Sequence, residues 1–260
     1  MTATETPATR GPTAEERRGI AQDLRLLALL HEREPSADLI ETMRRVGVDA
    51  LFSLPLTGDR GDKALDFLVM ALSPDLTGTS PTALAELAAD HAAIYLTHTH
   101  RVHPSESPWI DPEGLTSQQS MFEVRDWYRH WGLEVPNWRI RPDDHLVVQL
   151  GFVAHLMDAV DHPHALVDAA RFLDRHLLRW IETFAEGVTA RCWMAYWAAV
   201  AEVTVTHLWT LRNRLAEIPG CERTEIEPIE AEKKRREREA AGDRSSCATP
   251  AFVPGLEPSW

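Results

Sequence analysis

The sequence predicts an all-α fold of roughly ten helices. From about residue 13 to residue 217, apolar side chains recur three and four positions apart, which is the spacing of one buried helix face. Residues that favour helix starts precede many of these runs. No stretch shows the alternation of a strand, and the best candidate, Val203–Val205, lies inside a long helical pattern. No internal repeat is visible.

The helices of the N-terminal part are each predicted from a start signal. Thr13 and Glu16 have the spacing of a capping box, in which both side chains satisfy backbone N–H groups of the first turn. Ser36 starts a second helix and a third runs from about Gly61. Ser80-Pro81 starts a fourth, because proline at the first helical position loses no hydrogen bond.

The helices beyond residue 115 are predicted in the same way. Gly132 should end the first of them, since glycine readily adopts the left-handed conformation found at helix ends. The first of these helices is expected to start at Thr116, with Gln119 completing its cap. The next should span about 144–160, with Asp143 or Asp144 as its cap. Further helices are expected from Pro163, over about 178–185 and over 188–217.

The composition bounds the class of protein. The chain has 260 residues and a formal net charge of −13, so it would be repelled by a phosphate backbone and no nucleic-acid partner is expected. Its three cysteines form no CxxC pair, which is typical of a reducing cytosol. Residues 1–12 are expected to be disordered and not to form a secretory signal. No membrane span is expected elsewhere in the chain. The charged and Pro-containing residues 218–260 are interpreted as a solvated tail rather than an exposed helix.

The stretch 98–115 is predicted to be a loop, because it lacks periodicity and is rich in proline and histidine. Long ordered loops are often functional. His98, His100 and His103 could be metal ligands, but their spacing matches no zinc site, so no metal or cofactor is expected. Gly58–Lys63 lacks the spacing of a phosphate loop and is interpreted as a turn.

Asp143, Asp144 and His145 follow a proline at a predicted helix start. In the simplest interpretation, the carboxylates satisfy free backbone N–H groups and suit the helix dipole. In the functional interpretation, they form an acid–imidazole pair at the rim of a cleft, which binds the basic or polar part of a peptide or acts as a general base. No nucleophile stands in a recognisable context, so we expect no catalytic residue.

Aromatic residues gather on the helix after the loop. Two or three of the residues on its apolar side, which includes Trp127, are expected in the core, whereas Phe122 falls off this stripe and is expected to face residues 104–112. Exposed aromatic surface beside such a loop would suit an apolar helix or strand from a partner.

Three segments together resemble one protein family. They are His-Pro-Ser-Glu-Ser-Pro-Trp-Ile-Asp at 103–111, Val-Arg-Asp-Trp-Tyr-Arg-His-Trp-Gly-Leu at 124–133, and Pro-Asp-Asp-His-Leu-Val-Val-Gln-Leu-Gly-Phe at 142–152. The pattern is similar to that of the TorD/DmsD family of redox-enzyme maturation (molybdoenzyme-specific) chaperones. The sequence departs from it at Gln149, where the family often carries Glu, and at Ser105, which replaces a common aromatic.

The resemblance implies one all-helical chaperone domain over 13–217, with subdomains of about 13–97 and 116–217 joined by the loop 98–115. It implies a cytoplasmic, non-catalytic monomer or domain-exchanged dimer without a cofactor or stable membrane insertion. Its partner would be the apo-form of a molybdopterin oxidoreductase subunit, or the twin-arginine signal peptide of that subunit. The resemblance and the aromatic helix together give the expected client-binding residues, which are Asp144, His145, Glu106, Ser107, Trp109, Asp143, Phe122 and Trp127.

Two other classes of protein stay open. A metal-dependent hydrolase would use His98, His100, His103 and Asp144, which would have to converge in a dry pocket. A non-catalytic adaptor would act through its charged C-terminal tail. In that case deletion of residues 219–260 would abolish binding, whereas Asp144→Ala would not.

Overall fold

The computed structural model describes residues 11–97, 99 and 101–246, and the expectations for residues 1–10, 98, 100 and 247–260 lie outside this range. The protein is 66% helical and has no β-sheet among the described residues, so the predicted all-α class is confirmed. The helices of the N-terminal part are α1 (Ala14–Glu32), α2 (Ala37–Val46), η1 (Val48–Ala50), α3 (Gly58–Ala71), α4 (Pro81–His91) and η2 (Ala92–Leu96).

The remaining helices belong to two compact units, of which the first ends at Ile226 and the second begins at Glu227. They are α5 (Ser107–Ile110), α6 (Gln119–His130), α7 (Leu146–Asp158), α8 (Ala165–Phe172), η3 (Leu173–Leu177), α9 (Leu178–Thr189), α10 (Ala195–Ala216) and, in the second unit, α11 (Ile229–Ser246). None of the helices in the described part is long and apolar enough to cross a membrane.

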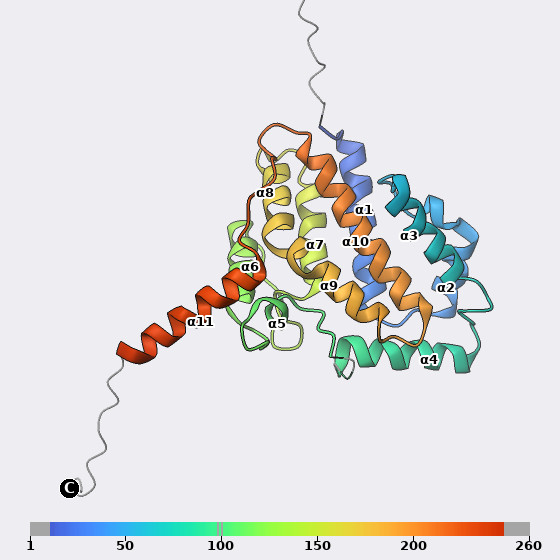
Figure 1. Cartoon of the computed structure of the whole chain (residues 1–260). Coiled ribbons are helices and arrows are strands. Elements are labelled where there is room, and N and C mark those ends of the chain that lie inside the picture. Colours follow the sequence, from blue (N-terminus) through green and yellow to red (C-terminus); the bar gives the residue numbers. More distant parts are fainter. Residues whose placement is uncertain (1–10, 98, 100, 247–260) are drawn as a thin grey trace, which may run out of the picture. The chain divides into compact units, whose positions relative to one another are not determined.

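α1 and α10 lie at the centre of the first unit, with α7 and α8 on one side and α2 and α3 on the other (Figure 1). α1 packs against α7, and α10 packs against both α3 and α9. One continuous core of buried apolar side chains therefore includes residues from both halves of the chain. The division into two subdomains stays a prediction.

Arg17 ties α1 to the C-terminal end of α7. Its buried guanidinium donates to the carbonyl oxygens of Leu156, Met157, Ala159 and Val160 at 2.9–3.1 Å. The last carbonyls of a helix lack intrahelical donors, so a cation at this position satisfies them and suits the helix dipole. This arrangement fixes α7, whose other end carries the candidate site.

Several predicted helix signals are confirmed. Thr13 forms the complete capping box, and the Ser36 and Ser80 side chains accept from the third backbone N–H of their helices. Gly132 has a positive φ of 68° and follows Trp131, the C-cap of α6, as expected of a helix stop.

Other expectations were wrong. Gly58–Lys63 is not a turn but the first part of α3. Thr116 does not cap α6, which follows Gln118 without a side-chain cap. The charged stretch after residue 228 is not a solvated tail without helix but forms α11. Ion pairs between side chains four residues apart, such as Arg235–Glu239, stabilise this helix.

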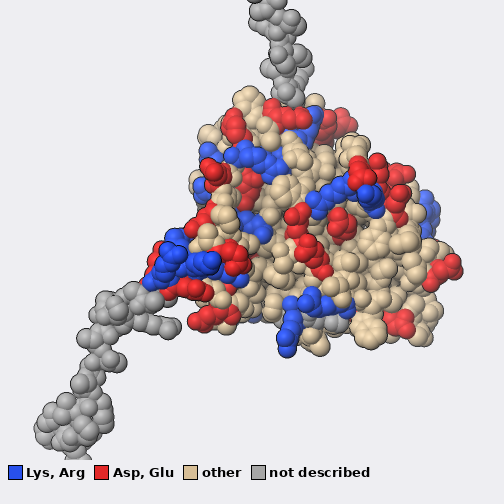
Figure 2. Space-filling model, in the orientation of Figure 1, with Lys and Arg blue, Asp and Glu red and all other residues tan. Residues whose placement is uncertain are grey.

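Charge is mixed on one face of the protein. On the face drawn in Figure 2, acidic and basic side chains are interspersed over the helical unit rather than separated into fields of one sign. The net charge of −13 therefore does not form one acidic patch on this face. Overall charge therefore does not mark a site on this face.

Candidate functional site

The central loop is held by the segment that precedes α7. Ser105 and His145 form an isolated antiparallel bridge, the Glu106 N–H donates to the Asp144 carbonyl at 3.1 Å, and the Leu146 N–H donates to the Pro104 carbonyl at 2.7 Å. The loop predicted over 98–115 also contains the short helix α5. Its backbone at residues 104–107 thus has a defined conformation, set by residues about 40 positions away.

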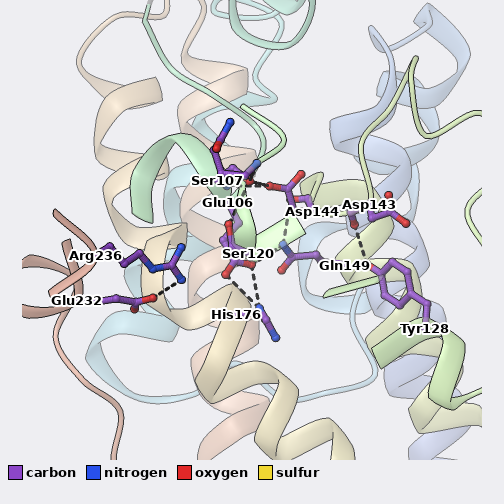
Figure 3. A network of polar contacts seen from close by, with 11 residues as sticks. Glu106, Ser107, Ser120, Tyr128, Asp143, Asp144, Gln149, His176, Glu232 and Arg236 are labelled. Atoms are coloured by element: carbon purple, nitrogen blue, oxygen red, sulfur yellow. Dashed lines mark hydrogen bonds and ion pairs between the residues drawn. The ribbon is translucent and has the colours of Figure 1, made fainter. Parts of the chain in front are cut away.

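Asp144 and Ser107 form the centre of this contact (Figure 3). The Asp144 Oδ2 atom accepts from the Ser107 N–H at 2.8 Å and from the Ser107 hydroxyl at 2.5 Å. The Ser107 hydroxyl oxygen also accepts from the Gln118 N–H at 3.1 Å and so links α6 to the loop. Asp144 is fully buried, and burial raises its pKa from 3.8 to about 6, although the hydrogen bonds from Ser107 act in the opposite direction.

Glu106 is a second buried carboxylate in the same network (Figure 3). It accepts from the Gln149 side-chain amide at 2.9 Å, and one of its oxygens lies 3.1 Å from His176 Nδ1. The Gln149 amide also donates to the Asp144 carbonyl at 2.9 Å. A buried carboxylate needs donors on both oxygens, and Gln149 and His176 supply them here.

Asp143 faces α6 instead of solvent. Its carboxylate pairs with Arg125 at 2.8 Å. Its carbonyl accepts from the Tyr128 hydroxyl at 2.9 Å (Figure 3). The expectation that Asp143 or Asp144 caps α7 was wrong. His145 is the N-cap, and its Nδ1 accepts from the Val147 N–H at 3.2 Å. The two carboxylates are therefore both used inside the protein.

A cavity of about 490 Å³ lies beside His145. Its wall combines imidazole, aromatic and aliphatic groups with the charged side chains of Glu32, Arg139 and Arg141. Tyr95 enters the wall from the π-helical turn η2. Ile140 is 85% exposed and Leu96 is 67% exposed, so large apolar side chains meet solvent at this cavity. The imidazole, aromatic and large aliphatic groups of the wall include His145, His103, Tyr95, Leu96, Trp138 and Ile140.

The predicted aromatic residues do not converge on this cavity. Trp109 is half-buried and donates its indole N–H to the His103 carbonyl at 2.9 Å, so it supports the loop from inside. Trp127 lines a different cavity, of about 570 Å³, together with His176. Phe122 is 47% exposed, and the Arg125 guanidinium lies 5.3 Å from the centre of its ring.

The structure thus divides the sequence-predicted residues into three groups. The first group lies in a buried polar network, which we call the lock. The lock consists of Glu106, Ser107, Asp143 and Asp144 together with Gln149 and His176. His145 stands at the edge of the first cavity. Trp109, Trp127 and Phe122 occupy separate places.

Sequence reasoning missed His176, Tyr95 and Ile140. His176 lies 70 residues from Glu106 and stands on the π-helical turn η3, which no local pattern announced. Tyr95 also lies on a π-helical turn, and such turns are frequent at functional sites. Ile140 is a large apolar residue between two arginines in a connector, and this was the one available signal in the sequence.

Ser107 and Asp144 are not presented to a substrate. The Ser107 hydroxyl bonds to a carboxylate, but both groups are fully buried, so this pair offers no nucleophile to a substrate. Among the residues that the structure describes, no group of three or more His, Cys, Asp or Glu side chains could hold a metal ion. His98 and His100 lie outside those residues.

Comparison with known proteins gives consistent relatives. A family model described as "Nitrate reductase delta subunit" matches residues 60–186. The chain is 28% identical over 144 residues to "Chaperone protein TorD" of Vibrio cholerae serotype O1 (strain ATCC 39315), a match that covers 52% of this chain and 65% of that relative. It is 26% identical over 184 residues to "Chaperone protein TorD" of Vibrio parahaemolyticus, covering 68% of this chain and 85% of that relative.

Proposed function

Because this chain belongs to the TorD/DmsD family of redox-enzyme maturation chaperones, we propose that it binds the apo-form of a molybdopterin oxidoreductase subunit. It would hold this client in the cytoplasm, by its twin-arginine signal peptide, its body or both, until the cofactor is inserted. It would do so without catalysing a reaction.

The observation that carries the proposal is the cavity beside His145, at which large apolar side chains meet solvent. A chaperone needs a surface that accepts apolar segments of an unfolded or incomplete client. Ile140, Leu96 and the partly exposed Trp138 provide such a surface, and His145 and His103 supply polar groups beside it. The volume of about 490 Å³ lies within the range of about 300–1,000 Å³ common for ligand sites.

Within this proposal, the buried lock positions the binding surface rather than contacting the client. Asp144 is committed to Ser107, and Asp143 to Arg125, so neither carboxylate is free to pair with an arginine of a signal peptide. The lock fixes residues 104–107 and the start of α7, which carry two sides of the cavity. Client contact is assigned to His145, Trp138 and Ile140.

Co-purification from cells that express an apo molybdoenzyme subunit tests the proposal. Ile140→Ser with His145→Ala should lower recovery of the subunit at least about fivefold, because binding energy is concentrated in a few central contacts. Val69→Ser is the matched control, since Val69 is an exposed aliphatic residue on α3 that does not line the cavity. Equal recovery with all three proteins would contradict the proposed binding surface.

A further inference from the structure

A second opening adjoins the first cavity, since Arg141 lines both. We call it the α7 groove and define it by Leu133, Glu134, Val135, Val148, Gly151 and Phe152. Its volume is about 440 Å³. The side chains around it are mostly aliphatic or aromatic, unlike the strongly charged wall of the cavity at Trp127.

Gly151 keeps this groove open. It is an exposed residue in the interior of α7, and a Cβ atom added there would meet no atom within 4 Å. Glycine weakens a helix interior relative to alanine, so neither close packing nor helix stability accounts for it. Its effect on the structure is to leave an unfilled space above the rest of the groove.

The floor of the groove is rigid. Phe152 is 3% exposed and Tyr128 2%, and their rings meet edge to face with centroids 4.8 Å apart. The Tyr128 hydroxyl is fixed by the Asp143 carbonyl at 2.9 Å. The floor is therefore anchored to the same segment that holds the central loop.

The charge at the groove is negative. Arg141 is paired with Glu32 at 2.6 Å, which offsets its positive charge. Glu134 forms no ion pair with any residue that the structure describes, and its carboxylate is exposed at the rim. An apolar channel with one unmatched carboxylate is complementary to an apolar segment that carries a basic side chain at its end.

We propose that the α7 groove binds the apolar run of the client's signal peptide as a short helix, with Glu134 facing a basic side chain at its N-terminal end. This inference rests on the proposed function and adds the place and chemistry of recognition. Apolar side chains at helical spacing would enter the groove beside Gly151. The first cavity, next to it, stays available for other parts of the client.

Fluorescence anisotropy with the full-length chain tests the inference. The probe is a labelled synthetic peptide with two arginines followed by an apolar run of about three helical turns. Gly151→Leu fills the groove and should weaken binding at least about tenfold. Gly151→Ala is the matched control, because it also removes the glycine but adds only a methyl group, and its affinity should stay within about twofold. Val135→Arg, which places a charge in the groove wall, is a second blocking variant.

The contribution of charge is measured separately. Glu134→Gln should weaken binding of the same peptide about two- to fivefold and reduce its salt dependence, as expected of an exposed ion pair. A peptide with glutamine in place of both arginines should bind wild type and Glu134→Gln equally.

The possible failures are distinguishable. If Gly151→Leu and Val135→Arg, both folded by circular dichroism, bind the peptide like wild type, the groove is not the site. If the wild-type protein does not bind the peptide but an apo oxidoreductase subunit still co-purifies with it, the inference fails and the proposed function stands. If wild type binds neither, both fail.

Discussion

The Asp144 carboxylate accepts two hydrogen bonds from Ser107, one from its backbone N–H at 2.8 Å and one from its hydroxyl at 2.5 Å. This contact joins the central loop to the segment before α7 across 37 residues of sequence. Both side chains are fully buried, so the contact holds the loop against this segment inside the protein. The other Asp144 oxygen, Oδ1, has no hydrogen-bond partner among the described residues, which adds to the cost of ionisation.

The stability contributed by Asp144 should depend on pH. Its pKa is about 6 in the folded protein against 3.8 for an ordinary aspartate, so between these values the folded state binds more protons than the unfolded chain. The contribution of this group to the free energy of unfolding therefore falls as pH rises from about 4 to about 6. Relative to Asp144→Asn, wild type should be more stable at pH 5 than at pH 7, as measured by urea unfolding. A difference that does not change with pH would contradict the raised pKa.

Gln149 should be required as a donor to Glu106. Gln149→Glu would place a second carboxylate against Glu106, which should cost about 2 kcal/mol or more at pH 7. The cost should shrink at pH 5, where one carboxylate of the pair can take up a proton. Gln119→Glu is the control, because Gln119 is exposed in the first turn of α6, where a negative charge suits the helix dipole. Equal stability of both variants in thermal unfolding would overturn this account of the lock.

A truncation after Ile226 should leave the first unit intact, whereas one after Glu217 should not. Fully buried Arg212 donates to the Cys221 and Glu222 carbonyls at 3.0 and 2.9 Å. A chain ending at residue 217 lacks these partners and should lose about 1–3 kcal/mol, whereas a chain ending at 226 keeps them. Melting temperatures of the two truncations give the comparison. Loss of client binding in the 1–226 chain, with an unchanged melting temperature, would support the adaptor alternative.

Alanine should have opposite effects at two helical glycines. At Gly61 in α3, a Cβ atom would lie 2.5 Å from the Leu56 backbone, so Gly61→Ala should destabilise the protein by about 1–3 kcal/mol. At Gly151 the space is open, and Gly151→Ala should stabilise the protein by about 0.5–1 kcal/mol. Chemical denaturation of the two single variants measures both effects. The same sign for both would show that the surroundings of the glycines are not as described.

The helices were predictable where local chemistry determines them. The Thr13 capping box, the Ser36 and Ser80 caps and the Gly132 stop are short-range signals, and the structure contains each of them. Glu106, Ser107, Asp143 and Asp144 could be selected because they stand in the matched motifs.

The roles of these residues could not be predicted, because they depend on partners far away in the sequence. Asp144 and Asp143 have the sequence signature of helix caps, yet Ser107 and Arg125 use their carboxylates and His145 caps α7. The partnership of Glu106 with His176 depends on the π-helical turn η3, and no periodicity argument gives that geometry. Cavities depend on packing between elements, so they too were out of reach.

Affinity purification of the tagged full-length chain from its own cells, followed by mass spectrometry of the bound proteins, tests the central claim most directly. The chaperone account predicts recovery of a molybdopterin oxidoreductase subunit that retains its signal peptide and lacks its cofactor. Recovery of no such subunit, from cells shown to express one, would contradict it.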